Sequence, residues 1–252
     1  MDSLKKTALA AAAGLAMVFM GGSAQAADMS DTFLEPILPV EIGSAWYLRG
    51  DIGYKIYTTP DAAYTSLGVG TRQFYDQSLS DAWLVGAGVG YRFNPWFRTD
   101  LTVDYEAPTD FNAKAPCLIA CAALPYSIES GRVSAWTILA NAYFDLGTWA
   151  GFTPYVGAGI GTSNVRLSNY YGYNPPFFFP TASVGSNAST WNFSWAVMAG
   201  ASIDITQNWL LDVNYRYLSL GDVNTVDQFG GQINIDDIAA HEFRLGVRFM
   251  ID

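Results

Sequence analysis

Apolar and polar side chains alternate along most of the chain after residue 45, which is the pattern of a β-strand. In WYLRGDIGYKIY (46–57), Arg49, Asp51 and Lys55 share one face, and the opposite face carries Trp, Leu, Ile and Tyr side chains. Successive side chains of a strand point to opposite faces, so the segment predicts a strand with one charged and one apolar face. A half-buried strand of a soluble protein alternates in the same way, so the other segments must decide which face meets water.

Seven further segments repeat this alternation. They cover residues 81–93, 97–107, 132–146, 152–167, 191–205, 209–220 and 241–251. Short turns such as Asn94-Pro95-Trp96 follow the second, fourth and sixth segments, since Asn and Pro favour tight turns. Long polar or mixed stretches follow the first, third, fifth and seventh segments. This order of segments predicts antiparallel hairpins with short connections at one end and long connections at the other.

The charged faces indicate which side of the sheet is wet. In 97–107, Arg98, Asp100, Asp104 and Glu106 share one strand face, and such a face cannot lie in hydrocarbon. A soluble barrel has an apolar inside, whereas repeated charged or glycine-rich faces favour the inverted, membrane form. The sequence therefore predicts an all-β fold: an eight-stranded antiparallel transmembrane β-barrel over residues 44–252, with short periplasmic turns, long extracellular loops and both termini periplasmic. A hairpin hidden in residues 108–130 would make ten strands instead.

Side chains fill the interior of an eight-stranded barrel. Charges on the inner strand faces therefore predict ion pairs in the lumen, because a buried charge without a partner is costly. The predicted members are Arg49, Asp51, Lys55, Arg92, Arg98, Asp100, Asp104, Glu106, Asp212, Arg216, Glu242, Arg244 and Arg248. Tryptophans near segment ends predict aromatic belts at the two membrane interfaces. They are Trp46, Trp83, Trp96, Trp149, Trp191 and Trp209.

The first residues and the composition agree with export to a membrane. Lys5 and Lys6 precede a short apolar run that ends near Ala24-Gln25-Ala26, which predicts a signal peptide over residues 1–26. An N-terminal anchor is the alternative, but the run is shorter than the ~20 residues that span a bilayer. Residues 27–43 are predicted to form a periplasmic leader. Hydrophobic residues make up 50% of the chain and charged residues only 14%, below the ~25% of soluble domains.

Charge and cysteine content limit the ligands. The net charge of −10 argues against nucleic-acid binding, which needs a basic surface, and leaves cations as ligands of acidic loops. Cys117 and Cys121 predict a local disulfide in an oxidising compartment. A metal site is the alternative, but two thiolates without a neighbouring His make a poor one. We expect no cofactor.

Three motifs suggest chemistry but have simpler structural explanations. Arg49-Gly50-Asp51 spells an integrin-recognition tripeptide, but it lies mid-strand with both charges on the inner face. His241, the only histidine, would be the base of a catalytic triad, yet adjacent Glu242 points to the opposite strand face. Carboxylates such as Asp100 are explained by ion pairing alone. The sequence therefore predicts no enzyme activity.

An aromatic stretch, NYYGYNPPFFFP (169–180), predicts a contact loop. It would either bind a host surface or lipopolysaccharide, or fold over the barrel mouth. The candidate contact residues are Tyr170, Tyr171, Tyr173, Phe177, Phe178 and Phe179.

Five short motifs together resemble a known family. WYLRGDIGY, GAGVGYRF, NAYFDLG, TPYVGAGIG and RLGVRF are similar to segments of the eight-stranded opacity-type and outer-membrane-protein-A-like barrels of Gram-negative bacteria. The chain looks nearest to the small surface-antigen porin family within them. The resemblance covers residues 44–252 and implies an outer-membrane location, surface loops, and roles in envelope integrity, antigenicity or adhesion.

The resemblance also implies an assembly signal and a set of partners. Arg244, Gly246, Phe249 and Ile251 resemble the C-terminal pattern read by the barrel-assembly machinery, although the chain ends in Asp252 rather than in an aromatic residue. The expected partners are outer-membrane lipids and lipopolysaccharide, the assembly machinery, and a host-surface ligand of the loops. A structural or adhesin-like surface protein with a plugged lumen is the predicted function, and a small ion-conducting porin is the alternative.

Overall fold

The computed structural model describes residues 45–66, 70–116, 126–174, 181–226 and 230–251. Its strands are β1 (Trp46–Tyr57), β2 (Asp61–Ser66), β3 (Gly70–Gln73), β4 (Tyr75–Leu79), β5 (Ala82–Asn94), β6 (Phe97–Pro116), β7 (Tyr126–Asp145), β8 (Phe152–Asn174), β9 (Thr181–Val184), β10 (Ala188–Asp204), β11 (Trp209–Val226) and β12 (Gln232–Met250). Within this described part, no helix is long and apolar enough to cross a membrane. The predicted signal peptide, the leader, Cys117, Cys121 and Phe177 to Phe179 lie outside the described residues.

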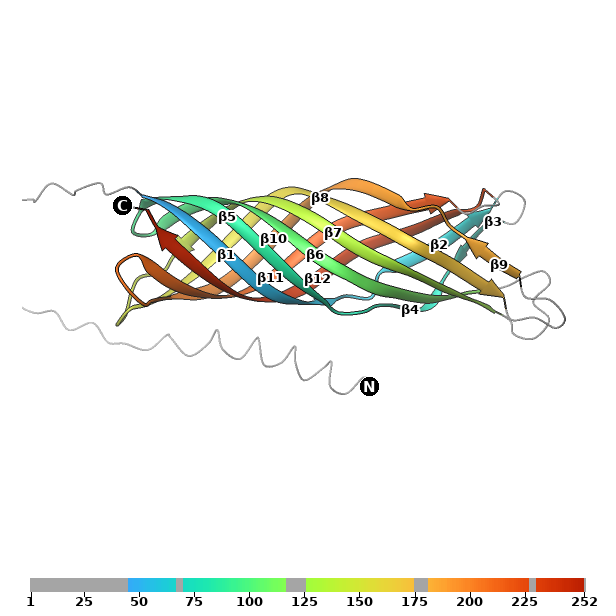
Figure 1. Ribbon diagram of the computed structural model, residues 1–252, viewed down its shortest axis with the longest axis horizontal. Helices are drawn as coiled ribbons and strands as arrows, with labels where there is room; N and C mark the ends of the chain where they lie inside the picture. Colours follow the sequence, from blue (N-terminus) through green and yellow to red (C-terminus); the bar gives the residue numbers. More distant parts are fainter. Residues whose placement is uncertain (1–44, 67–69, 117–125, 175–180, 227–229, 252) are drawn as a thin grey trace, which may run out of the picture. The chain divides into compact units, whose positions relative to one another are not determined.

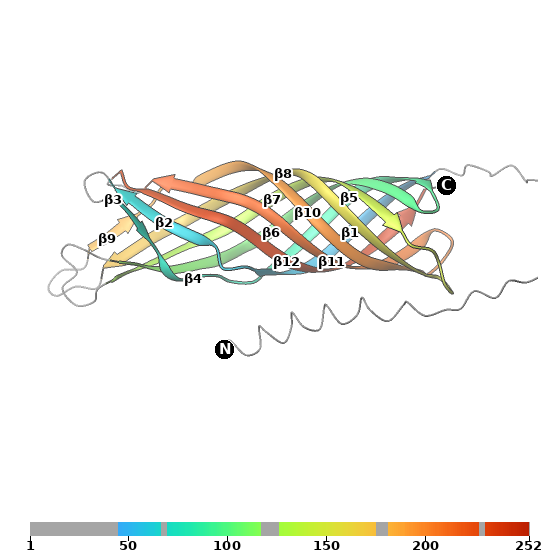
Figure 2. The same cartoon turned by 180° about the vertical axis from the view of Figure 1, so that it is seen from behind.

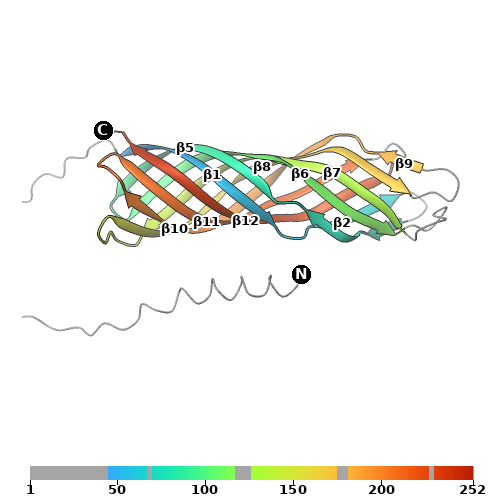
Figure 3. The same cartoon turned by 60° about the horizontal axis from the view of Figure 1, so that its bottom comes forward.

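Eight of the described strands close into an antiparallel ring (Figures 1 and 3). Their order is β1-β5-β6-β7-β8-β10-β11-β12, and pairing between β12 and β1 closes the barrel. Strands β6 and β7 pair from Phe97 with Phe144 to Pro116 with Tyr126, so residues 108–130 hold no extra hairpin of the ring where they are described. The predicted eight-stranded, all-β fold is confirmed, and the ten-strand alternative is wrong.

Short connections gather at one end of the barrel. Asn94 shapes the turn between β5 and β6, because its Oδ1 accepts hydrogen bonds from the backbone nitrogens of Trp96 (3.0 Å) and Phe97 (2.7 Å). The first and last described strands also meet here, where the Ile251 nitrogen donates to the Trp46 carbonyl oxygen (2.9 Å). Short turns mark the periplasmic end of outer-membrane barrels, so this is the periplasmic end.

The opposite, extracellular end carries the long connections, and much of their length is still strand. Strand β2 pairs with β12 beyond the end of β1, and β4 pairs with β6 beyond the start of β5. Figure 2 shows β2, β3, β4 and β9 gathered at this end. The wall of the barrel thus continues past the residues that alternate in the sequence.

Two aromatic belts bound an apolar band on the outer surface. Near the periplasmic end, Trp46 lies edge-on to Tyr91 and Trp209 packs against Phe249. The upper belt includes Tyr54 with Trp83, Tyr105 with Trp136, and Trp195 with Tyr217. On β7 the outward side chains run from Trp136 to Phe144 between the belts, roughly 20 Å at the usual rise and tilt of barrel strands. This band is the part that spans the membrane.

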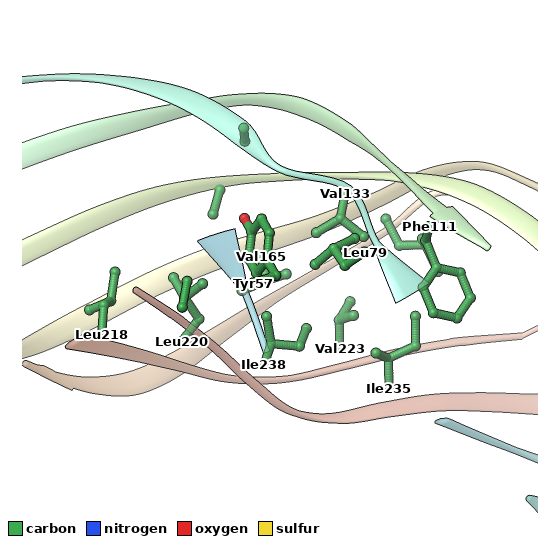
Figure 4. Packing of buried hydrophobic residues seen from close by; sticks show 14 of the residues in the cluster. Tyr57, Leu79, Phe111, Val133, Val165, Leu218, Leu220, Val223, Ile235 and Ile238 are labelled. Atoms are coloured by element: carbon green, nitrogen blue, oxygen red, sulfur yellow. The ribbon is translucent and has the colours of Figure 1, made fainter. Parts of the chain in front are cut away.

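Beyond the upper belt the outer surface becomes polar and the interior becomes apolar. Figure 4 shows side chains from several strands packed inside this half, among them Leu220, Val165, Ile238 and Phe111, all buried. On β6 the inward positions change from even to odd numbers after residues 107–108, where the pairing with β7 shifts register. A β-bulge of this kind lets the strand continue while the same face stays turned inward.

Candidate functional site

The membrane half of the interior contains a network of ion pairs centred on Asp104. Arg244 binds it at two points, with Nη2 2.6 Å from Oδ1 and Nη1 2.8 Å from Oδ2. Arg216 reaches the same carboxylate through Nη1, 2.8 Å from Oδ2. Planar guanidinium groups match the two oxygens of a carboxylate, which makes these contacts strong as well as directional.

Two further groups of charges flank this centre. Arg49 donates to both oxygens of Asp51 and to Asp100, at 2.8 to 3.0 Å. Lys55 lies between Glu106 and Glu242, and its Nζ forms an ion pair with each of them. All of these side chains are buried, so each charge has exchanged water for a partner of opposite sign.

Nearer the periplasmic end, aromatic rings as well as carboxylates contact the cations. The guanidinium of Arg98 lies over the Tyr143 ring (4.0 Å) and the Tyr155 ring (4.5 Å), and it pairs with Asp145 at 3.2 Å. A cation over an aromatic face gains electrostatic stabilisation, most of all when water is excluded. A further buried pair joins Arg248 to Asp212 at 3.1 Å.

All the predicted lumen residues except Arg92 are buried inside the barrel. Arg92 is exposed, so its predicted place in the network is wrong. It lies opposite Arg98 at the last regular pair before the turn, where the pairing of β5 with β6 shifts register. The barrel opens to water there, and a like charge opposite gives Arg92 no reason to turn inward.

Several members of the network were not predicted from the sequence. Asp145 ends β7, where alternation stops, and it partners Arg98. Tyr143 carries no charge, yet its hydroxyl accepts a hydrogen bond from Arg49 at 2.8 Å. Asn141 donates to Asp100 at 2.8 Å and to Thr102 at 3.1 Å. Because Tyr and Asn are neutral, the only sequence signal for them is that they occupy inward-facing positions in the alternation of β7.

Charge does not fill the whole interior, which corrects the expectation of a charge-filled lumen. Above the network the inward positions of β11 are Leu218, Leu220 and Val223, and those of β12 include Ile238 and Ile235. These residues lie in stretches that the sequence assigned to the long connections or to segment ends. The interior therefore has two layers, a charged one at membrane level and, outside the membrane, a mainly apolar one that also contains the buried Glu129.

The predicted contact loop is only in part an exposed loop. Residues 169–174 belong to β8, and Tyr170 is 2% exposed with its hydroxyl 2.6 Å from Glu129 Oε2 inside the barrel. Its predicted surface role is therefore wrong. Asn169 has a left-handed φ of 52°, and the register with β7 shifts beside it, which turns Tyr170 inward. Tyr171 is exposed and stacks with Tyr173, with ring centroids 6.4 Å apart.

The Arg-Gly-Asp tripeptide and the single histidine lie on opposite faces of the barrel wall. Arg49 and Asp51 are buried in the lumen, out of reach of another protein. His241 lies on the outer face, where its Nδ1 is 2.7 Å from the Tyr215 hydroxyl, while Glu242 is buried inside. In the predicted assembly signal, Arg244 points inward and Phe249 packs on Trp209 outside; its role in assembly stays a prediction.

Comparison with known proteins agrees with this geometry. The family model described as outer membrane protein beta-barrel domain matches residues 13–250. An uncharacterized protein of Brucella suis biovar 1 is 33% identical over 266 residues, covering 90% of this chain and 92% of that protein.

More distant relatives carry functional names. Outer membrane protein PagN of Salmonella typhimurium is 29% identical over 180 residues, covering 65% of this chain and 71% of PagN. A putative adhesin of Rickettsia bellii is 26% identical over 213 residues, covering 81% of this chain and 87% of that protein. The outer membrane protein OprG from Pseudomonas aeruginosa has the same fold, with a TM-score of 0.56 at 11% identity over 83% of this chain and 97% of OprG. This chain belongs to the outer membrane protein β-barrel domain family, and the protein lies in the outer membrane of a Gram-negative bacterium.

Proposed function

We propose that the protein is a closed, non-enzymatic surface barrel that contacts other surfaces through its extracellular end. The observation that carries this proposal is the two-layered interior. Ion pairs fill the membrane level, and buried Leu, Ile, Val and Phe side chains fill the level above it. An ion would have to separate buried charge pairs and then cross an apolar layer, and both steps are costly.

The extended wall supports the second half of the proposal. Strands β6 to β8 and β10 to β12 continue past the upper aromatic belt, so their described extracellular ends lie away from the bilayer. The packed core between these strand ends gives a binding surface a rigid support. The relatives named as adhesins, which match most of this chain, favour an adhesin-like role.

Single-channel conductance of the refolded protein in a planar bilayer tests closure. We expect no openings for the wild type, and leakage for Arg98→Ala or Asp104→Ala, which each remove a buried lumen charge. Asp110→Ala is the matched control, because that carboxylate is in an exposed pair with Arg132 on the outer surface. Stable openings of the wild type would contradict a closed barrel and support the small ion-conducting porin instead.

Cell binding tests the contact role separately. Bacteria that display the wild type should bind host epithelial cells more than bacteria that display a Phe177→Ser, Phe178→Ser, Phe179→Ser variant. A Val184→Ser, Val226→Ser variant controls for general loss of apolar surface, because both valines are exposed at the extracellular end. Equal binding by all three strains, at equal surface abundance, would refute contact through this stretch.

A further inference from the structure

A polar groove lies on the outer surface just above the apolar band. It has a volume of about 460 Å³, and side chains of β6, β7, β8 and β10 line it. These four strands run side by side in the wall (Figure 1). The lining includes Tyr105, Ser134, Trp136, Asn164, Arg166 and Ser189.

Strand register builds this groove from residues far apart in the sequence. Trp136 pairs with Tyr105 on one side and with Asn164 on the other, which sets the floor of the groove at the upper aromatic belt. One step farther from the membrane, Arg166 pairs with Ser134 and with Ser189. Ser189 donates a hydrogen bond to Asn164 Oδ1 at 2.9 Å, which ties the two rows together.

Arg166 is an exposed cation with no ion pair to a described residue. Two other cations of the extracellular half differ in this respect: Arg132 pairs with Asp110, and Lys114 pairs with Asp76. An unpaired guanidinium beside hydroxyl and amide groups is suited to an anionic group that carries further hydrogen-bonding partners. A phosphorylated sugar has this chemistry, and its apolar ring face fits against an indole such as that of Trp136, which is 51% exposed.

The apolar surface below the groove favours a sugar that belongs to a lipid over a soluble glycan. Trp136, Ile160 and Phe193 are exposed on the outer wall at or beneath the groove, where hydrocarbon chains lie against the barrel. A ligand with a headgroup in the groove would therefore have its acyl chains against this wall. A soluble glycan would gain nothing from that apolar surface.

We propose that this groove, the Arg166 groove, binds the phosphorylated sugar headgroup of a glycolipid in the outer leaflet. Arg166 binds the phosphate, Trp136 packs against the sugar ring, and Asn164 and Ser189 contact its hydroxyl groups. The site lies on the outer surface, separate from the lumen, so it does not depend on the closed state of the barrel.

Native mass spectrometry of the refolded protein in micelles, titrated with lipid A, measures this binding. We expect Arg166→Gln to weaken binding about tenfold, as the loss of a charge-assisted contact does. Trp136→Leu should weaken it as well. Arg92→Gln is the matched control, because Arg92 is also exposed and has no ion pair to a described residue, but it lies at the periplasmic end, and we expect its affinity to equal that of the wild type.

Three other probes identify the ligand. Dephosphorylated lipid A should bind the wild type and Arg166→Gln equally, because the phosphate is the partner of Arg166. Phosphatidylglycerol, which has a phosphate but no sugar, should bind the wild type more weakly than lipid A. Inorganic phosphate at millimolar concentration should not displace lipid A; displacement would show a site for the free ion and overturn the glycolipid assignment.

Two results would overturn the site itself. One is an Arg166→Gln variant that binds lipid A as tightly as the wild type. The other is equal weakening by Arg92→Gln, which would indicate nonspecific charge attraction. Heat-dependent gel mobility verifies that each variant is folded, and Arg166→Lys, which keeps the charge, should retain more affinity than Arg166→Gln.

Discussion

Arg244 and Asp104 meet across the barrel interior in a two-point contact, although 140 positions separate them in the chain. Their strands, β12 and β6, are not neighbours in the ring, because β1 and β5 lie between them. The pair therefore joins opposite parts of the wall through the lumen rather than along a hydrogen-bonded edge.

Removal of this link should strongly destabilise the barrel. Asp104→Asn leaves Arg244 and Arg216 buried without their shared carboxylate, which costs about 3–5 kcal/mol for a broken buried pair. Urea unfolding in lipid vesicles, followed by tryptophan fluorescence, measures the loss. Asp110→Asn, which breaks the exposed pair with Arg132, should change the unfolding midpoint little; a similar loss in both variants would contradict the role of burial.

The apolar layer should stabilise the extracellular half in particular. Phe111 is fully buried there, so Phe111→Ala should cost about 3–5 kcal/mol through lost burial and the cavity that remains. Limited proteolysis should then cleave the extracellular half while the membrane-spanning part stays protected. Phe193→Ala, a change of the same size on the lipid-facing wall, should leave the extracellular half resistant.

Close approach of β7 and β8 should require a glycine at position 161. A Cβ atom there would lie 1.9 Å from the backbone oxygen of Ile138, so Gly161→Ala must push the strands apart. We expect a loss of about 1–3 kcal/mol, as for other overpacked positions, visible as a lower melting temperature in gel-mobility assays. Gly50→Ala is the control, since a Cβ atom at that position would meet nothing within 4 Å, and its melting temperature should match the wild type.

Acidic residues at the extracellular end should make its stability depend on pH. Partial burial, and then the nearby carboxylates of Asp222, Asp237 and Asp61, raise the pKa of Asp236 above its usual value. A raised pKa means that the folded state holds the proton more tightly, so stability should rise as pH falls through the weakly acidic range. Asp236→Asn should flatten this dependence in proteolysis assays of the extracellular end, whereas Asp204→Asn, at the periplasmic end of β10, should leave it unchanged.

The membrane half of the barrel is predictable from the sequence because a strict period of two marks each strand there. Asp100 and Val103, for example, fall on the expected faces. The fold, the family and the outer-membrane location were all confirmed. The inward charges were visible because a charged residue on a lipid-facing strand can turn only toward the lumen.

The extracellular half was not predictable in the same way because bulges break the period. Residues 107–108 shift the inward positions of β6 from Glu106 to Thr109, and Asn169 does the same on β8. Apolar side chains such as Leu220 also point inward there, whereas in the membrane half the apolar side chains point outward and the charged ones inward. The sequence pattern predicts loops for these stretches, because neither their period nor their polarity matches that of the strands in the membrane half.

The outer surface of the barrel changes from apolar to polar at the upper aromatic belt. This change keeps the barrel from shifting along the membrane normal. Movement toward the periplasm would carry Arg166 and Arg132 into hydrocarbon, at about 2–4 kcal/mol for each charge at the midplane. Movement outward would place Trp83 and Trp136 in water and draw the periplasmic turns into the bilayer. The barrel therefore has one preferred immersion depth, and the extracellular ends of its described strands lie at one height above the lipid headgroups.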